Sequence, residues 1–428
     1  MFIRKHFSLS SLIATTKSCL SKEKFAGSER SPISWIDCIM SGFAVFNLKC
    51  PSLLQYDKGI RSGALKANLQ HLFGVEHPPS DTCMRERLDQ IDPKQLRRPF
   101  KKIFAQLQRG KALESHQFLR GHYIISIDGT GQYSSKTVHC EQCCEKKHRS
   151  GEVTYYHHML GAALVHPDHK VVIPLAPEPI TKGDGATKND CERNASKRLL
   201  KDLRREHPHL KVLIVEDALA ANQPHLSLLE SLNMKYVIGV KPGDHEYLFD
   251  WISDLDAKEY AVFDEKETRH TFEYYHDVPL NDTHHDFRVN VIRYTETNKK
   301  GKVQRFSWVT NITITDDNVF DLMRAGRSRW RIENETFNTL KNQGYHFEHN
   351  YGHGYKNLCS VFTLLMLLAF LLDQVQEHCC NLYRKVREHC RTKYGLFEKC
   401  RVYFCDFEWL SWNDFYGAMI SPKSMSPP

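Results

Sequence analysis

The sequence predicts a mixed α/β fold preceded by a helical region, and three observations support this prediction. Apolar residues recur with helical spacing through residues 1–115. Short apolar runs that end at Gly, Pro or Asp then alternate with helical patterns up to residue 253, as in folds that pack helices against a sheet. Two of these runs, 158–165 and 170–175, are joined by the short turn His-Pro-Asp-His, so part of the sheet should be antiparallel.

The composition indicates a globular protein of a reducing compartment. With 428 residues, of which 41% are hydrophobic and 26% charged, the chain can bury a sizeable core. The net charge of +8 favours a polyanionic partner such as nucleic acid. The chain has 14 cysteines and no clear secretory signal, a combination typical of free or metal-bound thiols. The longest apolar run, 361–372, is too short to span a bilayer, so we expect no membrane association.

The first region, 1–115, should be helical and basic. Helices are predicted over 82–91, after Pro79, and from Pro93 to Leu107. Basic side chains accumulate here at Arg97, Arg98, Lys101, Lys102, Arg109 and Lys111. Such a cluster forms either a solvated helical face or a face that contacts DNA, and both interpretations stay open. We assign this region to DNA binding as a hypothesis.

Residues 116–253 should form the first part of the sheet domain. Two buried strands each end on an acid, 122–128 at Asp128 and 211–217 at Asp217. The other predicted elements are the hairpin strands 158–165 and 170–175, the helices 189–206 and 224–232, and the strand 235–240. Strands that first pair as a hairpin and then alternate with helices predict a mixed sheet.

The pattern changes at residues 254–304, where it predicts exposed antiparallel strands, and we interpret this stretch as a β-rich insertion. The second part of the sheet domain should follow at 305–376. It contains a strand at 306–311, a long helix at 316–342 and an apolar helix at 358–376. Residues 377–428 should be a helical tail with a disordered end.

Three acidic residues that are distant in the sequence could meet at one edge of this sheet. Asp128 and Asp217 lie at strand ends, where α/β folds place reactive groups. Glu333 lies on the predicted helix 316–342, on the same side as the apolar Trp330 and Phe337. Three carboxylates suit Mg²⁺ or Mn²⁺, and a pair of such ions supports phosphodiester cleavage.

Each of these acids also has a purely structural interpretation. An aspartate at a strand end is often a turn residue, and Glu333 could form a buried ion pair with Arg329. Glu216 competes with Asp217, although the alternation along a strand puts its side chain on the opposite face. Glu348 is the reserve candidate for Glu333.

The order Ile-Asp128-Gly-Thr, Val-Glu-Asp217-Ala and Arg-Trp-Arg-Ile-Glu333 resembles the DDE transposases of bacterial insertion sequences. The resemblance is greatest to the group with a β-strand insertion before the glutamate, and it covers residues 75–375. It implies an RNase H-like catalytic core that binds the terminal inverted repeats of its own element and cuts and rejoins DNA with Mg²⁺. It also implies that Asp128, Asp217 and Glu333 are the metal ligands.

The family signature around the glutamate is Tyr-x2-Arg-x3-Glu-x6-Lys, and this chain matches it in part. Arg329 and Glu333 agree with the signature, Gly326 stands at the tyrosine position, and Lys341 lies eight residues beyond the glutamate instead of seven. In the family, the tyrosine, arginine and lysine hold the DNA end and its 5′ phosphate. The resemblance therefore implies DNA-binding roles for Arg329 and Lys341.

A Cys/His cluster at residues 139–158 has spacing that suits a structural Zn²⁺ site. Cys140 and Cys143 form a Cys-x2-Cys pair, and His148 and His157 complete a set of four ligands. Because only one Cys-x2-Cys pair is present, reduced thiols in a basic loop are the alternative interpretation.

Two further basic segments are candidates for contacts with the DNA backbone. The loop 182–188 resembles a phosphate loop only superficially, because it lacks Gly-Lys-Ser/Thr at the required spacing, and we interpret Lys188 as a backbone contact. The run 346–356 mixes aromatic residues, His and Lys356, and it either binds a DNA end or forms a partly buried aromatic loop.

The resulting prediction is a transposase that acts on double-stranded DNA, both at the terminal inverted repeats of its element and at a target. It should work in the bacterial cytoplasm, associated with the nucleoid, and as a dimer when two ends are brought together. Two alternatives stay open, namely an RNase H-like nuclease without strand transfer and a non-catalytic DNA-binding relic of a transposase.

Overall fold

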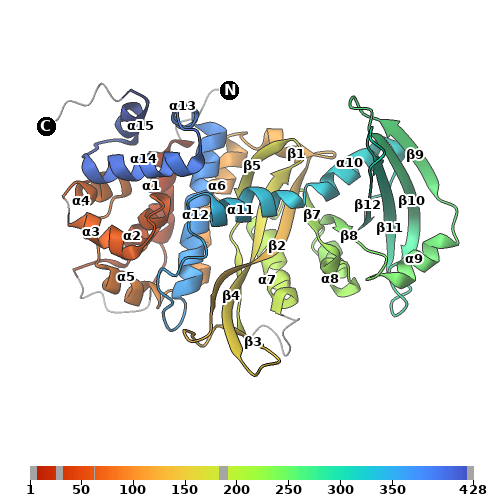
Figure 1. The fold of residues 1–428 in the computed structure, drawn as a ribbon, viewed down its shortest axis with the longest axis horizontal. Coiled ribbons are helices and arrows are strands. Elements are labelled where there is room, and N and C mark those ends of the chain that lie inside the picture. The colour runs from red at the N-terminus through yellow and green to blue at the C-terminus, as the bar shows by residue number, and fades with distance from the viewer. Residues whose placement is uncertain (1–6, 26–31, 62, 183–190, 422–428) are drawn as a thin grey trace.

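A single sheet runs through the molecule, with a helical unit at one end and an antiparallel meander at the other (Figure 1). The computed structural model describes residues 7–25, 32–61, 63–182 and 191–421. The strand order along the sheet is β3-β4-β2-β7-β8-β12-β11-β10-β9, with β1 paired to β2, and β5 and β6 paired to β4. Parallel and antiparallel pairs occur together, which confirms the predicted mixed α/β fold.

The centre of the sheet consists of apolar strands that are buried on both faces. These strands are β2 (His122–Ser135), β4 (Val153–His166), β7 (Val212–Glu216) and β8 (Lys235–Gly239). β2 is antiparallel to β4 but parallel to β7, and β7 is parallel to β8. Parallel neighbours need crossover connections, which here contain the helices α7 (Cys191–Glu206) and α8 (Gln223–Ser231). The short strands are β1 (Gln117–Phe118), β3 (Cys144–Lys147), β5 (His169–Pro174) and β6 (Glu178–Ile180).

The meander extends the same sheet. Its strands are β9 (Lys258–Phe263), β10 (Arg269–Pro279), β11 (Arg288–Thr297) and β12 (Val303–Thr310), and the helix α9 (Glu246–Ser253) leads into them. All neighbours within the meander are antiparallel. β12 pairs with β8 at Trp308–Thr310, so the stretch expected as an insertion is hydrogen-bonded to the central sheet through this strand.

Helices from the two ends of the chain form one unit (Figure 1). The N-terminal helices are α1 (Leu9–Leu20), α2 (Trp35–Asn47), α3 (Leu53–Ile60), α4 (Ala64–Asn68), α5 (Asp81–Leu88) and α6 (Arg98–Arg109). The C-terminal helices are α13 (Asn381–Glu388), α14 (Lys393–Asp406) and α15 (Trp412–Ile420). The amide of Asn68 donates to the carbonyls of Phe404 and Phe407 at 2.7 Å, and the Phe73 ring packs against those of Phe404 and Trp412.

Helix α12 (Leu358–Cys379) lies between this helical unit and the sheet. Among the described residues it is the one helix long and apolar enough to cross a membrane, and 94% of its most apolar window is buried inside the protein. Its buried Asp373 forms an ion pair of 2.5 Å with Lys49 of the N-terminal region. A helix that is apolar on all sides is therefore explained here as the core between two layers.

Two predicted elements have different boundaries in the structure. Strand β2 does not end at Asp128 but continues to Ser135, because its pairing with β4 persists after its pairing with β7 has ended. The predicted helix 316–342 is interrupted: α10 (Asp316–Arg327) ends in a turn at Ser328, followed by the π-helical segment Ile332–Phe337 and by α11 (Asn338–Asn342). Apolar periodicity did not indicate this break, since the residues on both sides of the turn remain buried.

Candidate active site

Strands β2 and β7 bring Asp128 and Asp217 to the same edge of the sheet. The last residues paired between these parallel strands are Ser126 and Val215, and each aspartate follows its pair by two residues. The parallel register therefore places the two acids next to each other in the direction across the sheet. Asp217 caps the short helical turn after β7, where its Oδ1 accepts a hydrogen bond of 3.1 Å from the N–H of Leu219.

The segment that carries Glu333 packs directly on these strands. The Phe337 ring lies over Gly161, the β4 residue paired with Asp128, so closely that a Cβ at Gly161 would lie 2.9 Å from it. The hydroxyl of Ser126 donates a hydrogen bond of 3.0 Å to the carbonyl of Arg329. These two contacts bring Glu333 to Asp128. π-helical geometry, as found at Ile332–Phe337, is frequent at functional sites because it re-aims side chains.

Arg329 lies between two of the three acids. Its Nη1 is 2.7 Å from Glu333 and 3.4 Å from Asp128. One guanidinium cannot neutralise two carboxylates, so the group keeps excess negative charge when both acids are ionised. The Arg329 side chain is only 13% exposed, which makes this contact stronger than an ordinary surface ion pair.

The shortage of positive charge affects the protonation of Asp128. Burial, together with the hydrogen bond and the negative charge of Glu333, raises the pKa of this carboxyl to about 7, and Arg329 opposes the shift only in part. Near neutral pH the Asp128–Glu333 pair thus tends to hold a proton. A site that holds a proton between two carboxylates suits a divalent cation, which supplies the missing positive charge. The donor set of Asp128, Asp217 and Glu333 therefore fits Mg²⁺ or Mn²⁺.

Two neighbouring glutamates have different surroundings. Glu216 is buried and hydrogen-bonded at 2.6 Å to Nε2 of His225 on α8. Burial lowers the pKa of His225, but the charge of Glu216 outweighs it and the net shift is upward. Glu192 of α7 is an acid that our sequence reasoning missed. It contacts Gly129, lines a cavity of about 470 Å³ together with Asp128 and Asp217, and has a pKa raised by partial burial and by Asp217.

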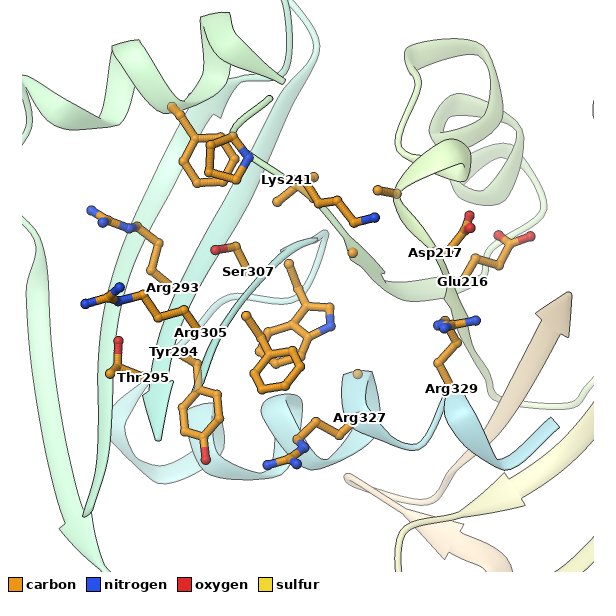
Figure 2. Close-up of a pocket in the computed structure, with 18 of the residues that line it drawn as sticks. Glu216, Asp217, Lys241, Arg293, Tyr294, Thr295, Arg305, Ser307, Arg327 and Arg329 are labelled. Carbon is orange, nitrogen blue, oxygen red and sulfur yellow. The ribbon is translucent and has the colours of Figure 1, made fainter. Parts of the chain in front are cut away.

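A second cavity of about 810 Å³ lies between Asp217 and the meander, and it is lined by cationic side chains. Figure 2 shows Arg329 and Asp217 at one end of this cavity, Lys241 between, and Arg293 and Arg305 at the other end. Arg293 is paired with Glu273 at 2.9 Å. By contrast, neither Lys241 nor Arg305 forms an ion pair with any residue that the structure describes.

Aromatic side chains complete the wall of this cavity next to Arg329. Trp330 is 49% exposed, and its ring lies 4.2 Å from the guanidinium carbon of Arg329.

Trp308 of β12 explains why glycine stands at the tyrosine position of the family signature. A Cβ at Gly326 would lie 2.5 Å from the indole Nε1 of Trp308, so any larger residue at this position would collide with the ring.

The other predicted DNA contacts are not gathered at this cavity. Lys341 forms an ion pair of 2.8 Å with Glu348, the reserve candidate, and neither residue lines either of the two cavities beside Asp217. The Lys356 Nζ donates to Gln90 at 3.0 Å, on the side of the N-terminal helices. Lys188 lies outside the described residues.

Arg97 itself fits neither interpretation of the basic N-terminal side chains, a solvated face or a DNA-contacting face. It is buried and pairs with Glu206 at 2.9 Å, and with Glu178 and Asp202 at 3.5 Å. Burial of a cation requires such partners, and they lie on β6 and α7, which sequence spacing does not link to Arg97. The remaining basic side chains of α6 line a separate surface groove with residues of α1, among them Arg98, Lys101, Lys102 and Arg109.

The structure also gathers a Cys/His cluster that differs by one residue from the predicted set. Cys140, Cys143 and His157 lie together, and the fourth member is His353, with all four ligand atoms within 4.8 Å of one another. His148 is elsewhere, where its Nε2 lies 2.8 Å from the Thr154 hydroxyl. The three acids are not part of any such tight group among the described residues, as expected where Arg329 occupies the space between two of them.

Comparison with known proteins is consistent with this geometry. Residues 119–372 match the family described as transposase DDE domain, and this range contains all three acids, Arg329 and the Cys/His cluster. A search of curated proteins gave no match.

Proposed function

From the premise that this chain belongs to the family of transposases with a DDE domain, we propose that it cuts the ends of its own insertion sequence and joins them to target DNA. The family assignment gives the coarse function, which is transfer of polynucleotide strands during transposition. The observation that supports the finer proposal is that Asp128 and Asp217 each follow the paired residues of two neighbouring parallel strands, with Glu333 next to Asp128 through Arg329.

The three acids would hold the divalent cations on which such reactions depend. When bound, these ions supply an activated oxygen nucleophile and stabilise the leaving oxygen of the phosphodiester. Arg329 compensates the acids in the absence of the ions. When bound cations neutralise the carboxylates, the Arg329 guanidinium becomes available to a DNA phosphate at the mouth of the cavity. This agrees with the role that the family signature implies.

The cavity beside Asp217 is the proposed binding site for the DNA end. Lys241 and Arg305 offer positive charge without a competing carboxylate among the described residues, and phosphate contacts of this kind supply most of the affinity for DNA. Trp330 offers an exposed ring on which a base can stack. The proposal also includes the division of the chain into regions with bounds at 115, 253, 304 and 376. It further includes the terminal inverted repeats as the recognised sequence and a dimer in the complex of paired ends.

The test is an assay on a plasmid that carries both ends of the element, with Mg²⁺ and the purified full chain. A transposase yields joined products as well as cleaved ends, whereas nicks alone would support the nuclease alternative. Nicking without joining would be informative because this chain departs from the family signature at Gly326 and Lys341. If Asp128→Asn has the same activity as the unmodified chain, the proposed catalytic site is wrong.

A further inference from the structure

The Cys/His cluster shares no residue with the three acids, and its four side chains have the arrangement of ligands around one metal ion. Cys140 and Cys143 lie just before β3, His157 is on β4, and His353 comes from the loop between α11 and α12. The two sulfurs are 3.9 Å apart, Cys143 Sγ lies 3.3 Å from Nε2 of both histidines, and Cys140 Sγ lies 3.4 Å from Nε2 of His157.

These separations are those of ligands around one tetrahedral ion. Zn–S bonds of about 2.3 Å and Zn–N bonds of about 2.0–2.1 Å give tetrahedral edges of roughly 3.8 Å between two sulfurs and roughly 3.5 Å between sulfur and nitrogen. The one S–S distance and the three S–N distances given above agree with these values within a few tenths of an ångström, and all four ligand atoms lie within 4.8 Å of one another. Four protein ligands fill the coordination sphere, which is the arrangement of structural rather than catalytic zinc.

Backbone groups hold the ligands in the orientation that an ion requires. In the Cys-x2-Cys turn, the N–H of Cys143 donates to the carbonyl of Cys140 at 3.2 Å, and the N–H of Cys140 donates to the Cys143 sulfur at 3.4 Å. Nδ1 of His353 lies 3.0 Å from the carbonyl of Gly354 and can only donate there, so Nε2 keeps its lone pair for a metal.

Packing around the cluster is also specific. Cys143, His157 and His353 are buried, and the Tyr133 ring lies 4.5 Å from the His353 ring. Gly352 and Gly354 on either side of His353 have φ of 115° and 70°, so the loop turns sharply to present this side chain. Asp89 anchors the following residues, since its carboxylate accepts hydrogen bonds from the N–H groups of Tyr355, Lys356, Asn357 and Leu358.

We propose that Cys140, Cys143, His157 and His353 bind one structural Zn²⁺ that ties the loop after α11 to the β2–β4 part of the sheet. The loop containing His353 follows the segment that carries Glu333, so the ion would fix the far end of that segment just as Phe337 fixes its near end. This proposal does not depend on the transposase activity, because none of its ligands belongs to the group of three acids.

The test is the metal content of the full chain, purified without chelators and measured by elemental mass spectrometry. We expect one zinc per chain, largely lost in His353→Ala and retained in His148→Ala, the matched control at the ligand position that sequence spacing favours. Zinc retained in His353→Ala and lost in His148→Ala would overturn the assignment of the fourth ligand. A chain that contains no zinc and takes up none would overturn the site itself.

Cobalt substitution keeps the proposal testable even where a variant fails to fold. The unmodified chain with Co²⁺ should show the intense visible bands of a tetrahedral ion and a sulfur-to-metal band for two thiolates. His353→Cys should keep the tetrahedral bands and increase the sulfur-to-metal band by about half, because a third sulfur replaces a nitrogen. Because Co²⁺ at the three acids would add weak octahedral bands, the absence of tetrahedral and sulfur-to-metal bands in the unmodified chain is the result that would contradict the closed site, whatever the outcome of the DNA assay.

Discussion

The three acids and the Cys/His cluster are two sets of side chains with the chemistry of metal ligands, and they differ in exposure and in ligand type. The acids are hard oxygen ligands at an open edge, 23% exposed at Asp128 and 35% at Glu333, and an arginine occupies the space between two of them. The cluster is a closed set of sulfur and nitrogen ligands, already at ligand-to-ligand distances. The three acids therefore have excess negative charge and are open enough to exchange a bound cation, whereas the Cys/His cluster has the closed geometry of a permanently bound ion.

Both sites act on one stretch of chain. Glu333 stands near its beginning, where Phe337 packs on Gly161 of β4, and His353 stands at its end, where its Nε2 lies 3.3 Å from the Cys143 sulfur.

The largest effect should come from the open site. Glu333→Gln removes one of three charged oxygen ligands while keeping the size of the side chain, and we expect DNA cleavage to fall by on the order of 10³-fold or more. Glu335→Gln is the matched control, because Glu335 lies on the same segment but pairs with Arg331 at 3.2 Å. Equal cleavage rates for the two variants would mean that Glu333 is not a metal ligand.

Removal of zinc should affect stability more than chemistry. Treatment with a zinc chelator, followed by excess Mg²⁺, should lower the thermal midpoint by about 5 °C or more and expose the 343–357 loop to protease. Calorimetry and limited proteolysis measure the two effects. The His353→Ala variant should already show both and should not respond to the chelator, and a response equal to that of the unmodified chain would contradict the proposed link.

The packing of Trp308 against Gly326 predicts the sign of the stability change in Gly326→Ala. Glycine to alanine inside a helix usually stabilises, but at Gly326 the new methyl group would collide with Trp308, and we expect a loss of about 1–3 kcal/mol in the free energy of unfolding. Gly417→Ala in α15 is the control, because no atom lies within 4 Å of the added methyl group there, and it should stabilise. Denaturant titrations would decide, and stabilisation by Gly326→Ala would show that the indole moves freely.

The smallest effect should be a pH-dependent one at Asp128. Its pKa is raised to about 7 in the folded protein from an ordinary value of 3.8, so the folded state binds more protons and stability falls as pH rises between these values. Asp128→Asn removes this penalty, and at pH 8 without divalent ions it should stabilise by about 1 kcal/mol. Thermal unfolding at pH 4 and pH 8 tests this, since the variant should gain only at the higher pH.

Much of the fold could be predicted because it depends on local patterns. The buried strands β7 and β8, the helix α8 and the antiparallel strands of the meander follow from apolar periodicity and turn residues, and the structure has them within a few residues of the predicted positions. The order and spacing of Asp128, Asp217 and Glu333 were likewise sufficient to suggest the family, because the motif depends on residue types at given positions in the chain, although β2 continues beyond Asp128 and the predicted helix is interrupted.

Tertiary structure alone decided which distant side chains meet. His353 replaces His148 in the Cys/His cluster although it lies 210 residues beyond Cys143, because a loop anchored by Asp89 delivers it there. Gly326 is required by the Trp308 indole on strand β12, and Arg97 is buried against acids of β6 and α7. Sequence determines the periodicity and chemistry of each segment by itself, whereas contacts between segments depend on how the whole chain fills space.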